Sequence, residues 1–172
     1  MVKNGSILET DEMTVVTEYN PLIIDRTQYQ SEADLENEFI RRLLANGYER
    51  LAVNSEAELI NNLRIQIEKL NKIKFSDDEW NGLYTEHISN PNIGIVEKTT
   101  TIQKDEVKTI KRDDGSPINI KLIDKKFIHN NTLQVMNQYT QVGSRENRYD
   151  VTILVNGLPL VHAELKRRGV PL

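Results

Sequence analysis

RYDVTILVNGLPLVHAELK, residues 148–166, contains two apolar runs rich in β-branched residues, separated by the dipeptide Asn156-Gly157. Asn-Gly between two such runs is the strongest short-range signal of a two-residue hairpin turn. Val, Ile and Thr favour strands because their branched side chains pack well on a pleated surface. The sequence therefore predicts a β-hairpin whose strands are largely buried.

This hairpin is expected to bring two carboxylates together. Asp150 lies seven residues before Gly157 and Glu164 lies seven residues after it. Residues equidistant from a hairpin turn lie close across the ladder. Adjacent carboxylates repel and raise each other's pKa, whereas a hard divalent cation such as Mg²⁺ is bound by oxygen ligands of this kind. The pattern is therefore compatible with a metal-dependent hydrolytic site, while a plain strand surface is the commoner explanation for such spacing.

The alternation of a strand assigns faces to the residues around Glu164. Glu164 and Lys166 project on one face together with His162, whereas Ala163 and Leu165 point into the core. An ammonium beside two carboxylates can orient a water molecule or offset negative charge in a transition state. An exposed Glu–Lys pair on a strand remains the simpler structural alternative.

A helix is predicted from Ser31, a good N-cap residue with Asp34 three positions on, to Gly47. Its apolar stripe consists of Leu35, Phe39, Ile40, Leu43 and Leu44. Glu36 and Glu32 fall inside this stripe on a helical projection, and Glu38 falls on the far side. A carboxylate in a core-facing stripe predicts a metal or a basic partner, unless it lies at the margin and reaches water.

The remaining segments predict helices first and strands later. Helices are expected over 55–72, beginning at Ser55, and over 77–88, ending before Pro91. Strands are predicted over 93–102, 106–112, 118–126 and 131–143, with a helix as the alternative for 131–143, and residues 12–19 contain a short strand. The fold class is therefore α/β of the α+β kind, with a mixed or antiparallel sheet flanked by helices.

Composition limits the class of protein but does not identify it. Hydrophobic residues make up 38%, charged residues 28%, and the net charge is −4. There is no cysteine, which excludes disulfides and thiolate metal sites. No apolar run suits a membrane span or a secretory signal. We expect a cytoplasmic protein without a membrane partner. The acidic balance disfavours nucleic acid overall, although the second half carries basic clusters.

RYDVTILVNGLPLVHAELKRRG resembles the catalytic core of the endonuclease (R) subunit of type I restriction–modification enzymes, members of the PD-(D/E)xK nuclease superfamily. Residues 31–51 look like the opening helix of that family, and residues 127–150 look like the strand leading into the motif. The resemblance implies a restriction-endonuclease-like core over 29–172, with 1–28 as an N-terminal extension packed on or beside it. It also implies a nuclease domain that is truncated after the strand carrying Glu164 and Lys166.

Carried over position by position, the resemblance implies the residues of the site. The metal ligands would be Asp150, Glu164 and the backbone carbonyl of Leu165, and the catalytic lysine would be Lys166. Glu36 best matches the acidic residue of the first helix, with Glu32 as the second choice. Tyr149 stands where the superfamily name has proline.

The resemblance also implies DNA contacts and partners. Basic side chains near the motif are the candidate DNA contacts: Arg145, Arg148, His162, Arg167 and Arg168. The implied cofactor is Mg²⁺, and the implied substrate is double-stranded DNA. Further partners would be the methyltransferase and specificity subunits and a motor domain of the same polypeptide. ATP would act only through that motor, because the sequence has no G-x-x-x-x-G-K-[ST] loop.

Two alternatives remain open from the sequence. The domain could be a non-catalytic module that holds DNA or docks a subunit, with a vestigial acidic site. It could also be a stand-alone nuclease of the same superfamily with a repair role.

Overall fold

A computed structural model describes residues 8–10, 13–15, 31–141 and 147–166 of the chain. The chain divides into two units, Met1–Gln30 and Ser31–Leu172. In the first unit, β1 (Leu8–Thr10) pairs antiparallel with β2 (Met13–Val15). The short strand expected within 12–19 is therefore present, and it has a partner that the sequence pattern did not reveal.

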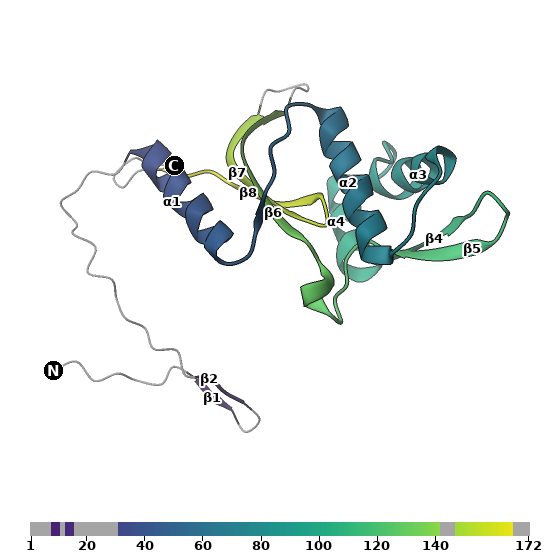
Figure 1. Cartoon of the computed structure of the whole chain (residues 1–172), viewed down its shortest axis with the longest axis horizontal. Coiled ribbons are helices and arrows are strands. Elements are labelled where there is room, and N and C mark those ends of the chain that lie inside the picture. The colour runs from purple at the N-terminus through teal and green to yellow at the C-terminus, as the bar shows by residue number, and fades with distance from the viewer. Residues whose placement is uncertain (1–7, 11–12, 16–30, 142–146, 167–172) are drawn as a thin grey trace. The chain divides into compact units, whose positions relative to one another are not determined.

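The second unit is built on a four-stranded sheet (Figure 1). Its strands run in the order β3 (Glu49–Arg50), β6 (Leu133–Gln141), β7 (Asn147–Val155) and β8 (Leu158–Ala163). β3 is parallel to β6, and the other pairs are antiparallel. The mixed sheet and its hairpin are confirmed, whereas the two-residue strand β3 was not predicted.

The turn between β7 and β8 is the predicted Asn-Gly turn. Asn156 and Gly157 have φ values of 51° and 82°, the left-handed conformation that a type I′ turn requires at both central residues. A Cβ at Gly157 would lie 2.6 Å from the Cα of Leu63. Glycine is therefore required here both by conformation and by the close approach of the hairpin to the neighbouring helix.

Two capped helices flank the sheet. α1 (Glu32–Ala45) begins at Ser31, whose hydroxyl accepts from the Asp34 N–H while the Asp34 carboxylate accepts from the Ser31 N–H. α2 (Glu56–Asn71) begins at Ser55, as predicted. Such caps satisfy backbone N–H groups that the helix leaves without partners.

The alternation of β6 gives each helix its own face. Val135 packs with Ile40 of α1 and with Val151 of β7. The preceding residue, Gln134, exchanges two hydrogen bonds of 3.0 Å with Asn62 of α2. Successive strand residues point to opposite faces, so α1 and α2 cover opposite sides of the sheet, as Figure 1 shows.

The third predicted helix is present as α3 (Asp77–Leu83), which continues into a single π-helical turn, Tyr84–Ile88. Trp80 stacks on Tyr84 with ring centroids 5.8 Å apart. Trp80 and Leu83 are buried in the main core cluster with residues of α2 and of the hairpin strand β8. None of the described helices is long and apolar enough to cross a membrane.

The strand predicted over 93–102 is wrong, because this segment forms α4 (Ile95–Lys104). The β-branched Ile, Val and Thr residues favoured a strand. The Gly94 N–H donates to the Glu97 carboxylate at 3.3 Å, which is half of a capping arrangement, and Ile102 packs on the core. Local capping and tertiary packing thus outweigh the weak preference of these residues for a strand.

The next two predicted strands are present, but they do not join the main sheet. β4 (Val107–Lys111) and β5 (Pro117–Lys121) form a two-stranded sheet of their own. The sequence predicted one mixed or antiparallel sheet, whereas these two strands form a second sheet beside the four-stranded one. Gly115 forms the turn between them with φ 85°, and a 3₁₀ turn, Ile128–Asn130, precedes β6.

Candidate active site

A β-bulge in β8 sets which residues face each other across the hairpin. Beside the turn, Leu154 pairs with Pro159, a register that would place Ala163 opposite Asp150. The extra residue, Leu160, shifts the register so that Val151 pairs with Ala163. The position opposite Asp150 is thereby that of Glu164. The sequence-based pairing agrees with this register, although the bulge that produces it was not foreseen.

Asp150 is fixed by the backbone of the returning strand. Its Oδ2 atom accepts a hydrogen bond from the Leu165 N–H at 2.6 Å. The assigned strand β8 ends at Ala163, so this bond continues the contact between the two chain segments beyond the ladder. A charge-assisted bond of this kind is short and orients the carboxylate.

Glu164 and Lys166 form an ion pair at the same end of the hairpin. The Lys166 Nζ atom lies 2.6 Å from Glu164 Oε1, and the two side chains are 36% and 62% exposed. The hydrogen bond that Lys166 donates to Glu164 and the charge of Glu164 raise the pKa of Lys166, and the charges of Glu32 and Asp150 raise this pKa further. Three carboxylates therefore act on one ammonium.

Alternate residues of the segment 162–166 are packed and exposed, as the strand alternation predicted. Ala163 and Leu165 pack against the cluster of Ile40, Val135 and Val151. This apolar side anchors the segment under α1. Residues at the alternating positions 162, 164 and 166 are exposed, so the charged groups stand on a firmly seated backbone.

His162 lies on the exposed face beside a cavity. Its Nδ1 atom is 3.0 Å from Thr152 Oγ1, and burial lowers the pKa of the imidazole. The cavity measures about 470 Å³ and is lined by His162, Thr152, Met136 and the start of α2 at Ser55. His162 is thus tied to the sheet rather than free to swing.

Glu36 is buried at 8% exposure, as its place in the apolar stripe indicated. Its Oε1 atom accepts from Asn137 Nδ2 at 3.0 Å, and Asn137 Oδ1 accepts from Arg50 Nη2 at 3.3 Å. This network connects α1, β6 and β3. Sequence reasoning missed Asn137 and Arg50 as its partners, and the only available signal was the anomalous position of Glu36 itself.

The two acidic residues proposed on α1 thus have different surroundings. The prediction that Glu32 lies inside the apolar stripe is wrong, because Glu32 is exposed in the first turn of the helix. Its charge acts on Lys166. Glu38, predicted on the far side, is paired with Arg41 and Arg42 at 2.8 and 2.7 Å.

Four of the five candidate DNA contacts lie outside the described residues. These are Arg145, Arg167, Arg168 and the side chain of Arg148, whose backbone belongs to β7. Only His162 is placed, at the cavity described above.

The donor set at this end of the hairpin suits a hard cation. Within the described ranges, no three acidic or histidine side chains converge to hold a metal ion. Mg²⁺ requires fewer, because it is usually held by one or two carboxylates together with substrate phosphates and waters. The carboxylates of Asp150 and Glu164 and the carbonyl of Leu165 are oxygen donors of this kind, and Glu164 would exchange Lys166 for the ion.

Comparison with known proteins identifies the family of this chain. The family described as type I restriction enzyme R protein N terminus matches residues 29–172. The chain belongs to this family. The match begins two residues before Ser31, the first residue of the second structural unit.

Curated relatives of this R protein N terminus are longer than the chain. It is 43% identical over 167 residues to the type I restriction enzyme EcoprrI endonuclease subunit of Escherichia coli, covering 96% of the chain and 53% of that protein. It is 39% identical over 149 residues to the type I restriction enzyme SsaAORF53P endonuclease subunit of Staphylococcus saprophyticus, covering 84% of the chain and 16% of that protein. The SauCOLORF180P endonuclease subunit of Staphylococcus aureus is 38% identical with the same coverage. The chain thus spans about half of the E. coli relative and far less of the staphylococcal ones.

Proposed function

We propose that this R protein N terminus is a Mg²⁺-dependent endonuclease domain that hydrolyses phosphodiester bonds of double-stranded DNA in a type I restriction enzyme. The observation that carries the proposal is the end of the β7–β8 hairpin, where Asp150 faces the position of Glu164 and Lys166 pairs with Glu164. The names of the relatives, all endonuclease subunits, support it.

In this proposal Asp150, Glu164 and the Leu165 carbonyl hold the metal. When bound, Mg²⁺ would polarise a phosphoryl oxygen and lower the pKa of a coordinated water. Asp150 is already oriented by the Leu165 N–H at 2.6 Å, so its carboxylate reaches the site with little loss of side-chain entropy. The apolar packing of Leu165 keeps its carbonyl fixed relative to both acids.

Lys166 has a role different from that of the metal ligands. Its ammonium is held by Glu164, and its pKa is raised by three carboxylates, so it stays charged. When Glu164 turns to a cation, the ammonium becomes available to the scissile phosphate. There it offsets the negative charge that develops on the phosphoryl oxygens in the transition state.

The finer assignments of the whole enzyme belong to the same proposal. Site recognition and methylation would lie in separate specificity and methyltransferase subunits. ATP-driven movement would lie in a motor domain of the same polypeptide, and the assembly would act in the cytoplasm.

The test is DNA cleavage by the full R protein assembled with its partner subunits. Glu164→Gln and Lys166→Met should each lower the rate of plasmid cleavage by at least ~100-fold, because the first removes a metal ligand and the second removes the cation that offsets developing charge. ATP hydrolysis should persist. Glu38→Gln, which alters a carboxylate paired with Arg41 and Arg42 on the outer face of α1, is the matched control and should cleave normally. Normal cleavage by either site variant would falsify the assignment.

A DNA-holding module without catalysis is the second candidate, favoured by the lack of a three-ligand cluster among the residues the structure covers. Mn²⁺ titration by calorimetry separates the two. Binding that disappears in Asp150→Asn supports the nuclease. Tight DNA binding with no Mn²⁺ uptake supports the module.

A further inference from the structure

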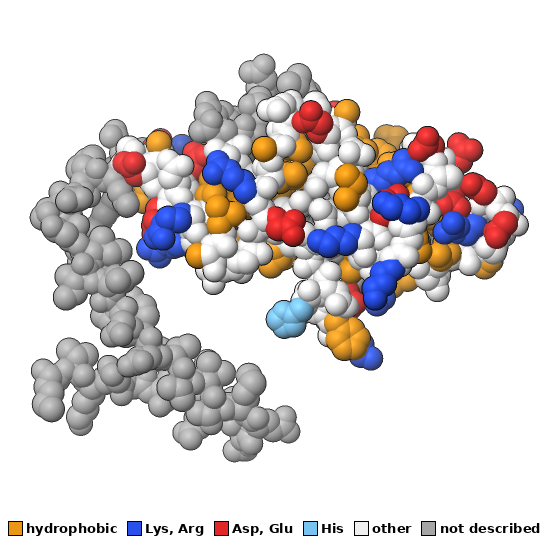
Figure 2. Space-filling view, in the orientation of Figure 1, with side chains coloured by type: hydrophobic (Ala, Val, Ile, Leu, Met, Phe, Trp, Pro, Cys, Tyr) orange, Lys and Arg blue, Asp and Glu red, His pale blue; other side chains and the backbone are white. Residues whose placement is uncertain are grey.

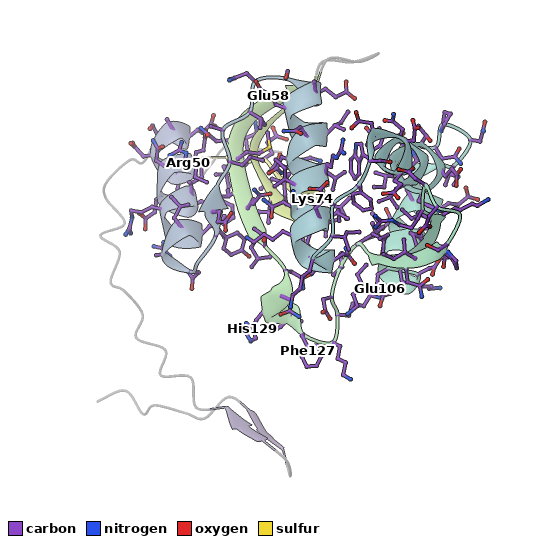
Figure 3. All side chains as sticks on the ribbon, turned by 45° about the vertical axis from the view of Figure 1, so that its right-hand side comes forward. Arg50, Glu58, Lys74, Glu106, Phe127 and His129 are labelled. Atoms are coloured by element: carbon purple, nitrogen blue, oxygen red, sulfur yellow. The ribbon has the colours of Figure 1, made fainter. Side chains whose placement is uncertain are left out.

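The loop between β5 and β6 holds two large apolar side chains in solvent. Phe127 is 57% exposed and Ile128 is 65% exposed. All residues from 125 to 130 are exposed, and this segment is called the tip loop below. Figure 3 shows Phe127 and His129 pointing away from the body of the domain.

The backbone of the tip loop is held in place by hydrogen bonds to a buried carboxylate. Asp124, only 4% exposed, accepts from the N–H groups of Phe127 at 3.0 Å and Lys126 at 3.2 Å. It also accepts from the Asn130 amide at 3.0 Å. The Phe127 N–H and Asn130 bonds are the main causes that hold the pKa of Asp124 down to about 2. The carboxylate therefore stays ionised and the loop keeps its shape.

Asn131 ties the same loop to the core. Its Oδ1 atom accepts from the Asp124 N–H at 2.8 Å, and its amide donates to the Asp124 and Ile128 carbonyls at 2.9 Å. The buried side chain of Asn156, in the hairpin turn, donates to Asn131 at 2.8 Å. This network fixes the backbone of the loop at Phe127 and connects it to the hairpin turn.

Cationic groups surround the apolar tip. Lys121 and Lys125 are 48% and 43% exposed, and the Lys126 ammonium lies 5.3 Å from the centroid of the Phe127 ring. The facing carboxylates are buried Asp124, which pairs with Lys121 at 3.3 Å, and Glu106, which pairs with Lys125 at 2.6 Å, so three ammonium groups face two carboxylates. Positive charge therefore exceeds negative charge here, and Figure 2 shows a hydrophobic side chain projecting with Lys/Arg and His atoms beside it.

We propose that the tip loop is a DNA wedge, in which Phe127 and Ile128 enter between base pairs of a duplex while the neighbouring lysines contact its phosphates. Rigid apolar side chains are inserted in this way by proteins that kink DNA from the minor groove. Lysines neutralise phosphates and release counterions. A protein partner fits less well, because lysine is depleted at protein interfaces.

The wedge precedes the first residue of β6, and the candidate active site lies beside the middle of this strand. Leu133 pairs with Val155 near the tip loop, and Asn137 pairs with Val151 beside Asp150. Four residues of strand span about 13 Å, roughly four base pairs of duplex. The part of the separation that β6 spans is therefore short on the scale of a duplex, and the tip loop adds to it. The inference rests on the proposed function for its choice of DNA, and it adds a second point of contact.

The test uses the full R protein carrying Glu164→Gln, without ATP, and a short duplex containing 2-aminopurine. With the wedge intact, binding should raise 2-aminopurine fluorescence, because unstacking relieves its quenching. The double variant Phe127→Ala/Ile128→Ala should lose this rise and bind at least ~5-fold more weakly, as expected for lost base contacts. Phe127→Trp should retain both signals. Val96→Ala removes another exposed apolar side chain, 75% exposed on α4, and should change neither.

The outcomes separate this inference from the proposed function. Unchanged affinity and fluorescence in the double variant overturn the wedge, even if the protein with Glu164 intact cleaves DNA. Normal DNA binding by the double variant together with a lowered Tm of the full R protein would also overturn the wedge. That result would mean that the tip loop packs against another part of the protein. Loss of fluorescence in the double variant supports the wedge, even if Glu164 and Lys166 prove dispensable for cleavage.

Discussion

Carboxylates lie near both ends of the β7–β8 hairpin, and those at each end have a different use. Asp124 lies outside the hairpin, in a loop that Asn131 connects to the turn residue Asn156. At the turn end, Asp124 is buried and accepts three hydrogen bonds from its own loop. At the open end, Asp150 accepts one hydrogen bond from the Leu165 N–H, and Glu164 is 62% exposed with one ion pair.

The carboxylates at the two ends differ in how many of their hydrogen-bond acceptor sites are filled. A carboxylate has about four acceptor sites. Three of those of Asp124 are filled by groups of its own loop, and the Lys121 ammonium lies 3.3 Å from its Oδ2 atom. Glu164 is held by one exposed lysine, and an exposed ion pair contributes little stability. Carboxylates that support the fold are satisfied internally, whereas those left for a cation or substrate are only lightly held. The predictions below alter one end and compare it with the other.

The largest effect on folding is expected at the turn end, from Gly157→Ala. The new Cβ would combine a φ of +82° with a 2.6 Å contact to the Leu63 backbone, so the hairpin must move away from α2. We expect a loss of about 3 kcal/mol in the free energy of unfolding. Gly115→Ala is the control. It has a φ of +85° but meets only the end of the Lys111 side chain at 3.6 Å, so it should cost about 1 kcal/mol.

Urea denaturation followed by circular dichroism measures both variants. Equal losses at the two glycines would show that conformation alone matters, and that the hairpin does not depend on its contact with α2.

The next effect sharpens the contrast between the two carboxylates. Asp124→Asn replaces an acceptor of backbone N–H groups with a partial donor, and it should lower the Tm at pH 7 by about 5 °C. Glu164→Gln should leave the Tm nearly unchanged. Because hydrogen bonds lower the pKa of Asp124 from 3.8 to about 2, its stabilisation is full above pH 3.8 and is lost as the pH falls through about 2.

The difference in Tm between the wild type and Asp124→Asn should therefore shrink between pH 4 and pH 2. Thermal melts at several pH values test this. A difference that stays constant down to pH 2 would mean that the charge of Asp124 does not hold the tip loop.

Local signals predicted the hairpin and the two capped helices because each depends on neighbours in the sequence. Asn156-Gly157, Ser31 with Asp34, and Ser55 all act within a few residues. The segment that became α4 carried conflicting local signals, and packing of Ile102 on the core decided the outcome. The separation of β4 and β5 from the main sheet depends on tertiary contacts, which no short window contains.

The register at the open end could be predicted because residues equally far from a hairpin turn lie opposite each other. Asp150, Glu164 and Lys166 need no contact from elsewhere to meet. The bulge at Leu160 and the pairing of Glu36 with Asn137, 101 residues away, had no local signature. The candidate wedge was also missed, because exposure of Phe127 depends on Asp124 and Asn131 folding the loop around them.

The smallest effect concerns which acidic residue of α1 serves the open end. Resemblance favoured Glu36, but Glu36 is buried against Asn137 at 3.0 Å, whereas the charge of exposed Glu32 acts on Lys166. We expect Glu32→Gln to lower cleavage about 3-fold with no change in Tm, because an exposed charge acts weakly through solvent. Glu36→Gln keeps an oxygen for Asn137 and should cost less than about 1 kcal/mol in stability. Cleavage assays and melts on both variants decide the matter. If cleavage collapses in Glu36→Gln alone, the buried carboxylate must reach the metal on binding DNA, and the lightly held open end would then include a residue that the fold keeps covered.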